Sequence, residues 1–177
     1  MNGELDFTAP DRFSADALGP VGQRVFLVHV AQAGTALTVK VEKQQVAVLA
    51  GYLSRLVGQL GRPGHLPEDL DFDAGVEPDW VVGTIGVSYD EDTDRLVVVL
   101  EERGPAAEIE ETVDGEEHEP MGMVARVAIS KEQAAAFAIR ATTLVEAGRP
   151  PCPLCGLPLD PSGHDCPRTN GHRPPLT

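Results

Sequence analysis

Residues 23–60 read QRVFLVHVAQAGTALTVKVEKQQVAVLAGYLSRLVGQL, and the hydrophobic pattern changes once within this stretch. Its first part, residues 23–31, is rich in β-branched residues, as strands are. Residues 35–41 (TALTVKV) alternate between apolar and polar side chains, and residues 32–34 form a turn sequence between the two runs. The first part of the stretch therefore predicts a β-hairpin.

After this hairpin the apolar residues recur at the spacing of a helix. Gly58, Gly61 and Pro63 supply the signals that end a helix. We therefore expect a helix over residues 43–60 that packs its apolar stripe against the sheet. The stripe consists of Val46, Leu49, Leu53, Leu56 and Leu60.

The remaining elements are expected on both sides of this stretch. Ser130 and Gln133 form an S-x-x-Q capping box, which predicts the start of a second helix over residues 131–147. Before the hairpin, residues 4–18 show no continuous strand or helix pattern, and Phe13 is expected to anchor the loop that follows it. Strands are expected around Leu5 and Phe7 and at residues 80–89, 95–102 and 121–129.

Two acidic stretches separate these elements. Residues 62–79 are expected to form a long, solvated loop. Residues 104–119 are acidic and poor in apolar side chains, which is typical of an exposed or disordered insertion. The second stretch has an alternative interpretation as a docking strip for a basic partner.

The two strand-to-helix junctions resemble each other. Residues 39–45 (VKVEKQQ) align without a gap on residues 127–133 (VAISKEQ), and Val127 lies 88 positions after Val39. Amphipathic helices that follow strands tend to look alike, so chance similarity is the alternative to a duplication. The duplication predicts two antiparallel strand-strand-helix units, at about 4–61 and 80–148.

The last residues hold the three cysteines. Cys152 and Cys155 form a CxxC turn, to which His164 and Cys166 add a second pair of ligands. Thiolate sulfur and imidazole nitrogen in this number are typical of structural zinc. His172 is an alternative fourth ligand. A redox-active CxxC pair and three ordinary thiols are the other interpretations, but the surrounding prolines argue against the helix that a redox motif opens.

Together these patterns predict an α+β fold made of two similar strand-strand-helix units, followed by a zinc knuckle. The boundary falls at residue 148, with the α+β domain at 1–148 and the zinc knuckle and tail at 149–177. A lone histidine inside the first strand, His29, is expected to be partly buried and hydrogen-bonded. We assign no catalytic residue.

The charge of the chain restricts its partners. The formal net charge is -14. Phosphate backbones and anionic membranes require lysine and arginine, so we expect no nucleic-acid or membrane binding and favour a protein partner. No apolar run is long enough to span a membrane, and we expect no signal peptide, because residues 1–13 lack a basic stretch followed by an apolar one. A CxxC motif without export indicates the reducing cytoplasm.

Four stretches resemble one family. They are residues 20–30 (PVGQRVFLVHV), 39–46 (VKVEKQQV), 80–90 (WVVGTIGVSYD) and 152–173 (CPLCGLPLDPSGHDCPRTNGHR). The family is the actinobacterial domain-of-unknown-function family 3090, an uncharacterised repeat-protein family. The resemblance implies a cytoplasmic actinobacterial protein without an established enzymatic activity. It further implies a link to a ParA-type chromosome-partitioning ATPase, as a modulator, and it carries over no catalytic residues.

Two functional hypotheses follow. The first is a non-enzymatic interaction or regulatory protein whose tail is held in shape by zinc. The alternative is a zinc-dependent hydrolase or a small-molecule-binding enzyme of a phosphorylation-linked pathway. The alternative needs an open position on the zinc, or a polar cleft that contains Arg24, His29 or Arg126. Neither hypothesis specifies an oligomeric state.

Overall fold

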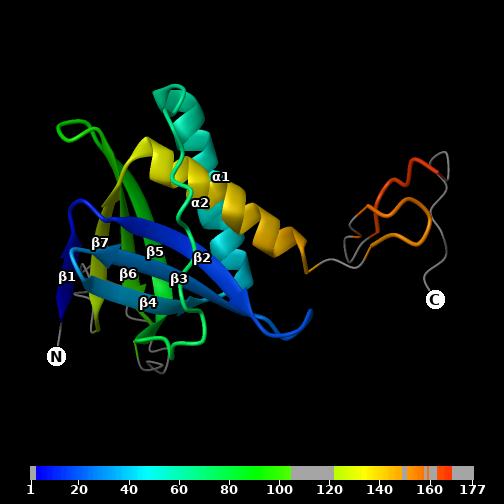
Figure 1. Ribbon diagram of the computed structural model, residues 1–177, viewed down its shortest axis with the longest axis horizontal. Coiled ribbons are helices and arrows are strands. Elements are labelled where there is room, and N and C mark those ends of the chain that lie inside the picture. Colours follow the sequence, from blue (N-terminus) through cyan, green and yellow to red (C-terminus); the bar gives the residue numbers. More distant parts are fainter. Residues whose placement is uncertain (1–2, 105–121, 149–150, 158, 160–162, 169–177) are drawn as a thin grey trace, which may run out of the picture.

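The computed structural model describes residues 3–104, 122–148, 151–157, 159 and 163–168 (Figure 1). Within these residues, seven strands form one mixed sheet, and two helices pack against each other on its core face. The elements in chain order are β1 (Glu4–Phe7), β2 (Arg12–Leu18), β3 (Val25–Gln32), β4 (Thr35–Val41), α1 (Lys43–Leu60), β5 (Trp80–Asp90), β6 (Arg95–Glu102), β7 (Val124–Ile129) and α2 (Lys131–Glu146).

The sheet has the order β1-β7-β6-β5-β4-β3-β2. Neighbouring strands are antiparallel except for two parallel pairs, β1 with β7 and β4 with β5. The β4–β5 ladder has only two residue pairs, Val39 with Trp80 and Lys40 with Val81. This short parallel ladder joins both halves of the chain into one sheet, with α1 as the crossover.

The sheet is strongly curved, because its two edge strands are close in sequence. A flat sheet of this order would place β1 about 29 Å from β2. Residues 8–11 connect these strands and span at most about 18 Å when fully extended. Accordingly, β1 also contacts β3. The start of α2 holds the connection in place, since the side-chain amide of Gln133 donates to the Pro10 carbonyl at 2.7 Å.

The strand β2 was not predicted from the mixed sequence of residues 4–18, in which Phe13 was expected to anchor the loop that follows it. Phe13 lies in β2, is 1% exposed and stacks on Phe137 of α2 with ring centroids 4.6 Å apart. The segment RFSADAL lacks the β-branched residues that mark strands. It forms a strand because all seven residues pair with β3 and because α2 covers its apolar side.

Both helices begin at the predicted residues. The first starts at Lys43 and ends at Leu60, and its buried residues include Val46, Leu49 and Leu53 from the predicted stripe. In α2, the Ser130 hydroxyl accepts the Gln133 N–H at 3.1 Å, and the Gln133 side chain accepts the Ser130 N–H at 3.0 Å. The capping box at this helix is confirmed.

The element order is the same in two parts of the chain. Three consecutive antiparallel strands precede each helix, β2-β3-β4 before α1 and β5-β6-β7 before α2. The first residues of the helices, Lys43 and Lys131, are 88 positions apart. A duplication stays a prediction.

Most of the acidic stretch 104–119 lies outside the described residues.

Candidate metal centre

The CxxC motif folds as a compact turn after α2. The Gly156 N–H donates to the Cys152 carbonyl at 2.8 Å, and the Cys152 N–H donates to the Leu157 carbonyl at 2.7 Å. Gly156 has a φ of 74°, in the left-handed region where a Cβ atom is unfavourable. The turn therefore holds both sulfur atoms of the motif on one side of a short, hydrogen-bonded loop.

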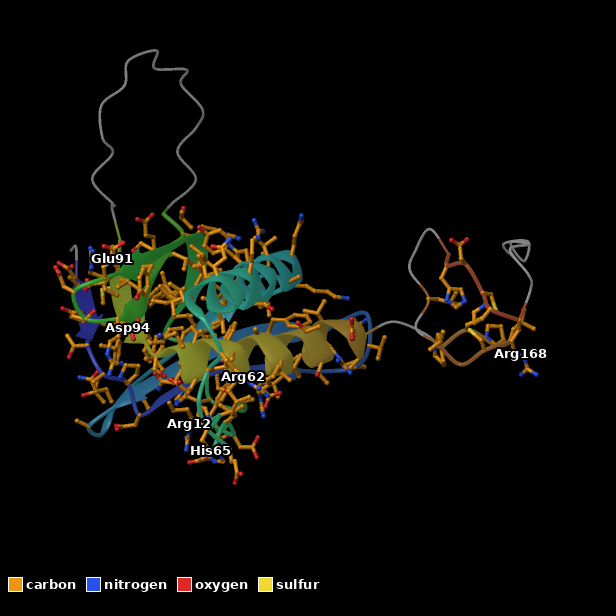
Figure 2. All side chains as sticks on the ribbon, turned by 90° about the horizontal axis from the view of Figure 1, so that it is seen from above. Arg12, Arg62, His65, Glu91, Asp94 and Arg168 are labelled. Atoms are coloured by element: carbon orange, nitrogen blue, oxygen red, sulfur yellow. The ribbon has the colours of Figure 1, made fainter. Side chains whose placement is uncertain are left out.

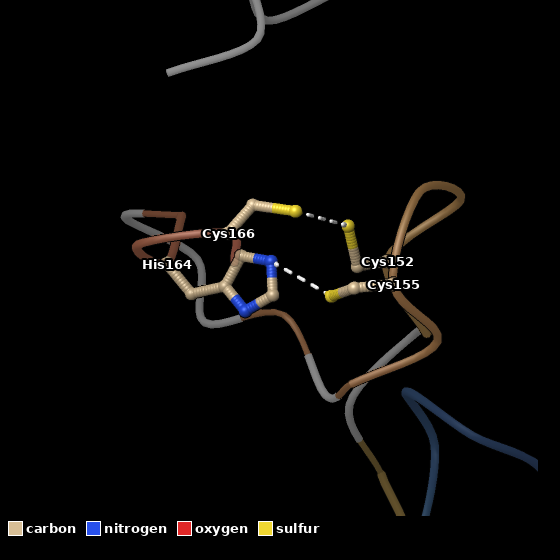
Figure 3. Close-up of side chains that lie close together, drawn as sticks. All are labelled: Cys152, Cys155, His164 and Cys166. Carbon is tan, nitrogen blue, oxygen red and sulfur yellow. Dashed lines mark hydrogen bonds between the residues drawn. The ribbon is translucent and has the colours of Figure 1, made fainter. Parts of the chain in front are cut away.

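The structure brings together four side chains that could hold a metal ion: Cys152, Cys155, His164 and Cys166 (Figure 3). Their ligand atoms all lie within 4.8 Å of one another. The sulfurs of Cys152 and Cys166 are 3.9 Å apart, and the Cys155 sulfur is 3.6 Å from His164 Nε2. Cys152 and Cys166 are buried, whereas Leu154 and Leu157 of the same segment are exposed.

These distances match the edges of a tetrahedral coordination shell. With metal–sulfur bonds of about 2.3 Å and metal–nitrogen bonds of about 2.05 Å, the sulfur–sulfur edge is about 3.8 Å. The corresponding sulfur–nitrogen edge is about 3.6 Å. The separations of 3.9 and 3.6 Å therefore match two edges of a tetrahedron around one ion.

The two cysteines of the CxxC turn have opposite pKa shifts. The backbone N–H groups of Cys155 and Leu154 point at the Cys152 sulfur and lower the pKa of this thiol to about 6. Burial is the main cause that raises the pKa of Cys155. The Cys152 sulfur is thus stabilised as a thiolate, whereas the Cys155 thiolate needs a nearby cation to offset its loss of solvent.

A residue that was not singled out in the sequence supports the cluster. The Arg168 guanidinium donates to the Leu154 carbonyl at 3.1 Å, which ties the segment after Cys166 to the CxxC turn. Three thiolates around a divalent cation carry a net negative charge, and Arg168 places a positive charge close to it. An arginine two positions after a cysteine carries no signal of this role by itself.

Among the described residues, the other candidate side chains do not come together in a second site. His172 lies outside the described residues. Arg24 donates to the Leu144 carbonyl at the end of α2, while His29 bonds to Thr38 at 2.9 Å, as expected for a partly buried histidine. Arg126 lines a separate surface hollow together with Glu4 and Glu101. These three residues point to three different places.

The described helices include none that is long and apolar enough to cross a membrane.

Comparison of the chain with curated proteins gives no match. Comparison with solved structures gives none either.

A family model described as "Protein of unknown function (DUF3090)" matches residues 5–166. The match covers the curved sheet and both helices, and it ends at the last cysteine of the cluster. The chain therefore belongs to the DUF3090 family of proteins of unknown function.

Proposed function

We propose that the Cys3His cluster is a structural zinc site. The observation that carries this proposal is the set of four soft or borderline ligand atoms that lie within 4.8 Å of one another. A redox pair needs only two thiols. Here a third thiol, that of Cys166, also lies close, with its sulfur 3.9 Å from the sulfur of Cys152. The ring of His164 next to Cys155 supplies the imidazole nitrogen that completes a Cys3His ligand set.

The site favours a structural role over catalysis. A catalytic zinc keeps a coordination position open for water or substrate, whereas four protein ligands complete the tetrahedron. Arg24, His29 and Arg126, which the enzyme hypothesis needs in one cleft, make separate contacts. The hydrolase hypothesis is therefore the less favoured one.

We infer that the protein is a non-enzymatic interaction or regulatory protein of the cytoplasm. A segment as short as 151–168 cannot bury a core of its own, so bound metal would supply the free energy that gives it one shape. A rigid, exposed segment on an acidic domain suits contact with another protein. The ParA-type ATPase implied by the sequence resemblance is the specific partner that we propose to test.

Metal analysis of the purified chain tests the site. We expect one zinc per chain, held through gel filtration. A chain that retains no metal, or retains iron in place of zinc, would contradict the zinc assignment.

Binding to a purified ParA-type ATPase tests the role of the site. The full-length chain and its Asp165→Asn variant should bind, because Asp165 is an exposed neighbour of two ligands. Cys155→Ser should bind much more weakly. Equal binding by Cys155→Ser would separate the metal from the interaction, and absence of binding by every form would reject this partner.

A further inference from the structure

Strand β5 has a long open edge. Its partner on one side, β4, pairs only with Trp80 and Val81 and then ends at Val41. β5 continues for nine more residues to Asp90, paired with β6 on its other side. Among the described residues, no strand lies against this remaining edge.

The hydrogen-bond pattern shows which backbone groups face the open side. The Glu102 N–H donates to Met123 beside β7, whereas the Arg103 N–H donates to Val81 of β5, so odd-numbered residues of β6 face β5. Their partners are even-numbered, for example Gly86 with Val99. Because successive residues of a strand face opposite sides, the N–H and C=O groups of Ile85, Val87 and Tyr89 face outward.

This edge begins at a β-bulge between Val82 and Thr84, but beyond the bulge it lacks the other features by which proteins protect exposed strands. Natural edge strands are short or carry lysine, proline or inward-pointing charges that prevent pairing with another chain. From Trp80 to Tyr89 the sequence WVVGTIGVSY contains neither a charged residue nor a proline. Within the described part of the chain, one backbone group of this edge accepts a hydrogen bond from a side chain, since the Gln45 side chain donates to the Gly83 carbonyl at 3.0 Å.

An apolar groove of about 490 Å³ runs between this edge and α1. On the helix side, Val48 is 64% exposed and Tyr52 is 39% exposed, which is unusual for large apolar residues on a helix that packs on a sheet. On the strand side, Ile85 and Val87 lie on the core face but are only half covered. The groove is lined by Glu42, Gln44, Gln45, Val48, Leu49, Tyr52, Ile85 and Val87.

We propose that the groove between β5 and α1, called the β5–α1 groove, binds an extended segment of a partner protein by β-strand addition. The backbone of the segment would pair with Ile85, Val87 and Tyr89. Its alternate side chains would enter the groove beside Val48 and Tyr52, which is how strand addition combines backbone affinity with side-chain specificity.

Charge specifies the partner further. From the groove residue Val87, β5 continues to the β5–β6 turn, which carries Asp90, Glu91, Asp92 and Asp94; Glu91 and Asp94 are labelled in Figure 2. Of the described basic residues, Lys131 contacts this turn, through Asp94 at 3.1 Å. The segment therefore carries lysine or arginine at the end that reaches the turn. A second copy of this chain, with a net charge of -14, is disfavoured by repulsion.

Hydrogen exchange of the free, full-length chain tests the edge. We expect the amides of Ile85, Val87 and Tyr89 to exchange at least about tenfold faster than those of Gly86 and Ser88, which face β6. Slow exchange at all five positions would mean that the edge is already covered and would overturn the proposal. Slowing that depends on protein concentration would show self-association through this edge and would overturn it too.

Titration with a synthetic peptide tests the groove. The probe has about eight residues, with isoleucine and threonine alternating and two lysines at one end. We expect it to shift the amide signals of Ile85, Val87 and Tyr89. Methylation of the peptide's alternate backbone nitrogens should abolish binding, and replacement of the lysines by glutamates should weaken it. A probe that leaves these signals unchanged, or binds equally well when methylated, would overturn the proposal.

A matched pair of variants locates the contact. Val48→Glu places a charge in the groove at an exposed position and should weaken probe binding by about tenfold or more. Ile139→Glu makes the same kind of change on the exposed side of α2, where Ile139 is 60% exposed, and should change binding by less than about twofold. Equal effects of the two changes would place the probe elsewhere.

The β5–α1 groove would be a second interaction surface of the protein, separate from the C-terminal metal segment. The groove belongs to the sheet and α1, so Cys155→Ser should bind the probe as well as the unchanged chain does. If the unchanged chain does not bind the probe, the groove is rejected and the zinc site is unaffected. If Cys155→Ser loses its metal but still binds the ParA-type ATPase fully, the zinc-dependent contact is rejected and the groove is unaffected.

Discussion

At the scale of residues, metal binding by the C-terminal cluster depends on the presence and protonation state of each of its four ligand atoms. The four ligand atoms lie within 4.8 Å of one another, so each protonated thiol or missing ligand leaves a gap in the shell. Metal ligation requires deprotonated sulfur, and the pKa of Cys152 is already lowered to about 6 by two backbone N–H groups. The turn therefore presents one thiolate near neutral pH before any ion arrives.

Removal of one buried ligand should release the metal. Cys166→Ala deletes a sulfur that is 3% exposed and 3.9 Å from the sulfur of Cys152, and we expect the zinc content of the purified chain to fall to background. Leu157→Ala is the control, because Leu157 is 50% exposed and is not a ligand. Full zinc occupancy in Cys166→Ala would contradict the ligand set.

His29 should make the stability of the sheet depend on pH. Burial, and then the nearby Arg12, lower its pKa, with Asp79 acting in the opposite direction. A pKa below the unfolded value of about 6.5 means that folding favours the neutral ring. Its contribution is therefore present above this pH and is lost as the pH falls through the lower, folded-state pKa.

Unfolding by urea at pH 7 and at pH 5 measures this effect. The loss of stability between these values should be smaller in His29→Gln than in the unchanged chain. The control is His65→Gln, in the loop between α1 and β5, where the His65 side chain is 88% exposed. This variant should lose as much stability between pH 7 and pH 5 as the unchanged chain does. An identical pH dependence in all three proteins would show that the pKa of His29 is the same in the folded and unfolded states.

At the scale of elements, α2 depends on its first turn. Ser130 accepts the Gln133 N–H at 3.1 Å, and Ser130→Ala should lower the free energy of unfolding by about 1 kcal/mol. Ser54→Ala is the control, since Ser54 is exposed in the middle of α1 and alanine is the better helix former. We expect Ser54→Ala to leave stability unchanged or slightly higher. An equal loss in both variants would argue against a specific cap.

The C-terminal segment and the sheet should respond differently to metal removal. Of the described residues between 151 and 168, Cys152 and Cys166 are the buried ones, whereas the sheet and helices share a continuous core. A chelator should therefore make the segment sensitive to protease and leave the circular dichroism of the sheet and helices unchanged. Cooperative loss of both signals would show that the metal also stabilises the main domain.

At the scale of the whole molecule, Arg140 connects three parts of the chain. Its guanidinium donates to the Ala15 carbonyl of β2 at 2.6 Å and contacts Asp16 at 3.2 Å. It also contacts Asp71 of the loop between α1 and β5 at 3.0 Å. A second arginine, Arg12, pairs with Asp69 of the same loop. These contacts attach the acidic loop to α2 and to the edge of the sheet.

Loss of this connection should affect both stability and the loop. Arg140→Met keeps the length of the side chain but leaves the Ala15 carbonyl without its donor, which should cost about 1–3 kcal/mol. It should also speed protease cleavage between residues 61 and 79. Arg55→Met is the control, because Arg55 is exposed on α1 and contacts only the ring of Tyr52 among the described interactions, 5.6 Å from its centroid. Similar effects of the two changes would contradict the anchoring role of Arg140.

The sequence by itself determined the features that depend on neighbours along the chain. Helix periodicity, the capping box at Ser130 and the turn at Gly156 are local, so their residues predicted α1, α2 and the CxxC turn. The four clustered ligands were also predicted, because fifteen positions from Cys152 to Cys166 form a loop short enough to close on itself.

Only the tertiary structure decided how the strands are arranged. The strand at β2 forms through pairing with β3 and through α2, whose Arg140 is 125 positions away from Ala15. The curvature of the sheet, the two-pair junction of β4 with β5 and the open edge at Ile85, Val87 and Tyr89 arise in the same way. Such contacts depend on which distant strands pair and where each ladder ends, and no periodicity within a single segment encodes that choice.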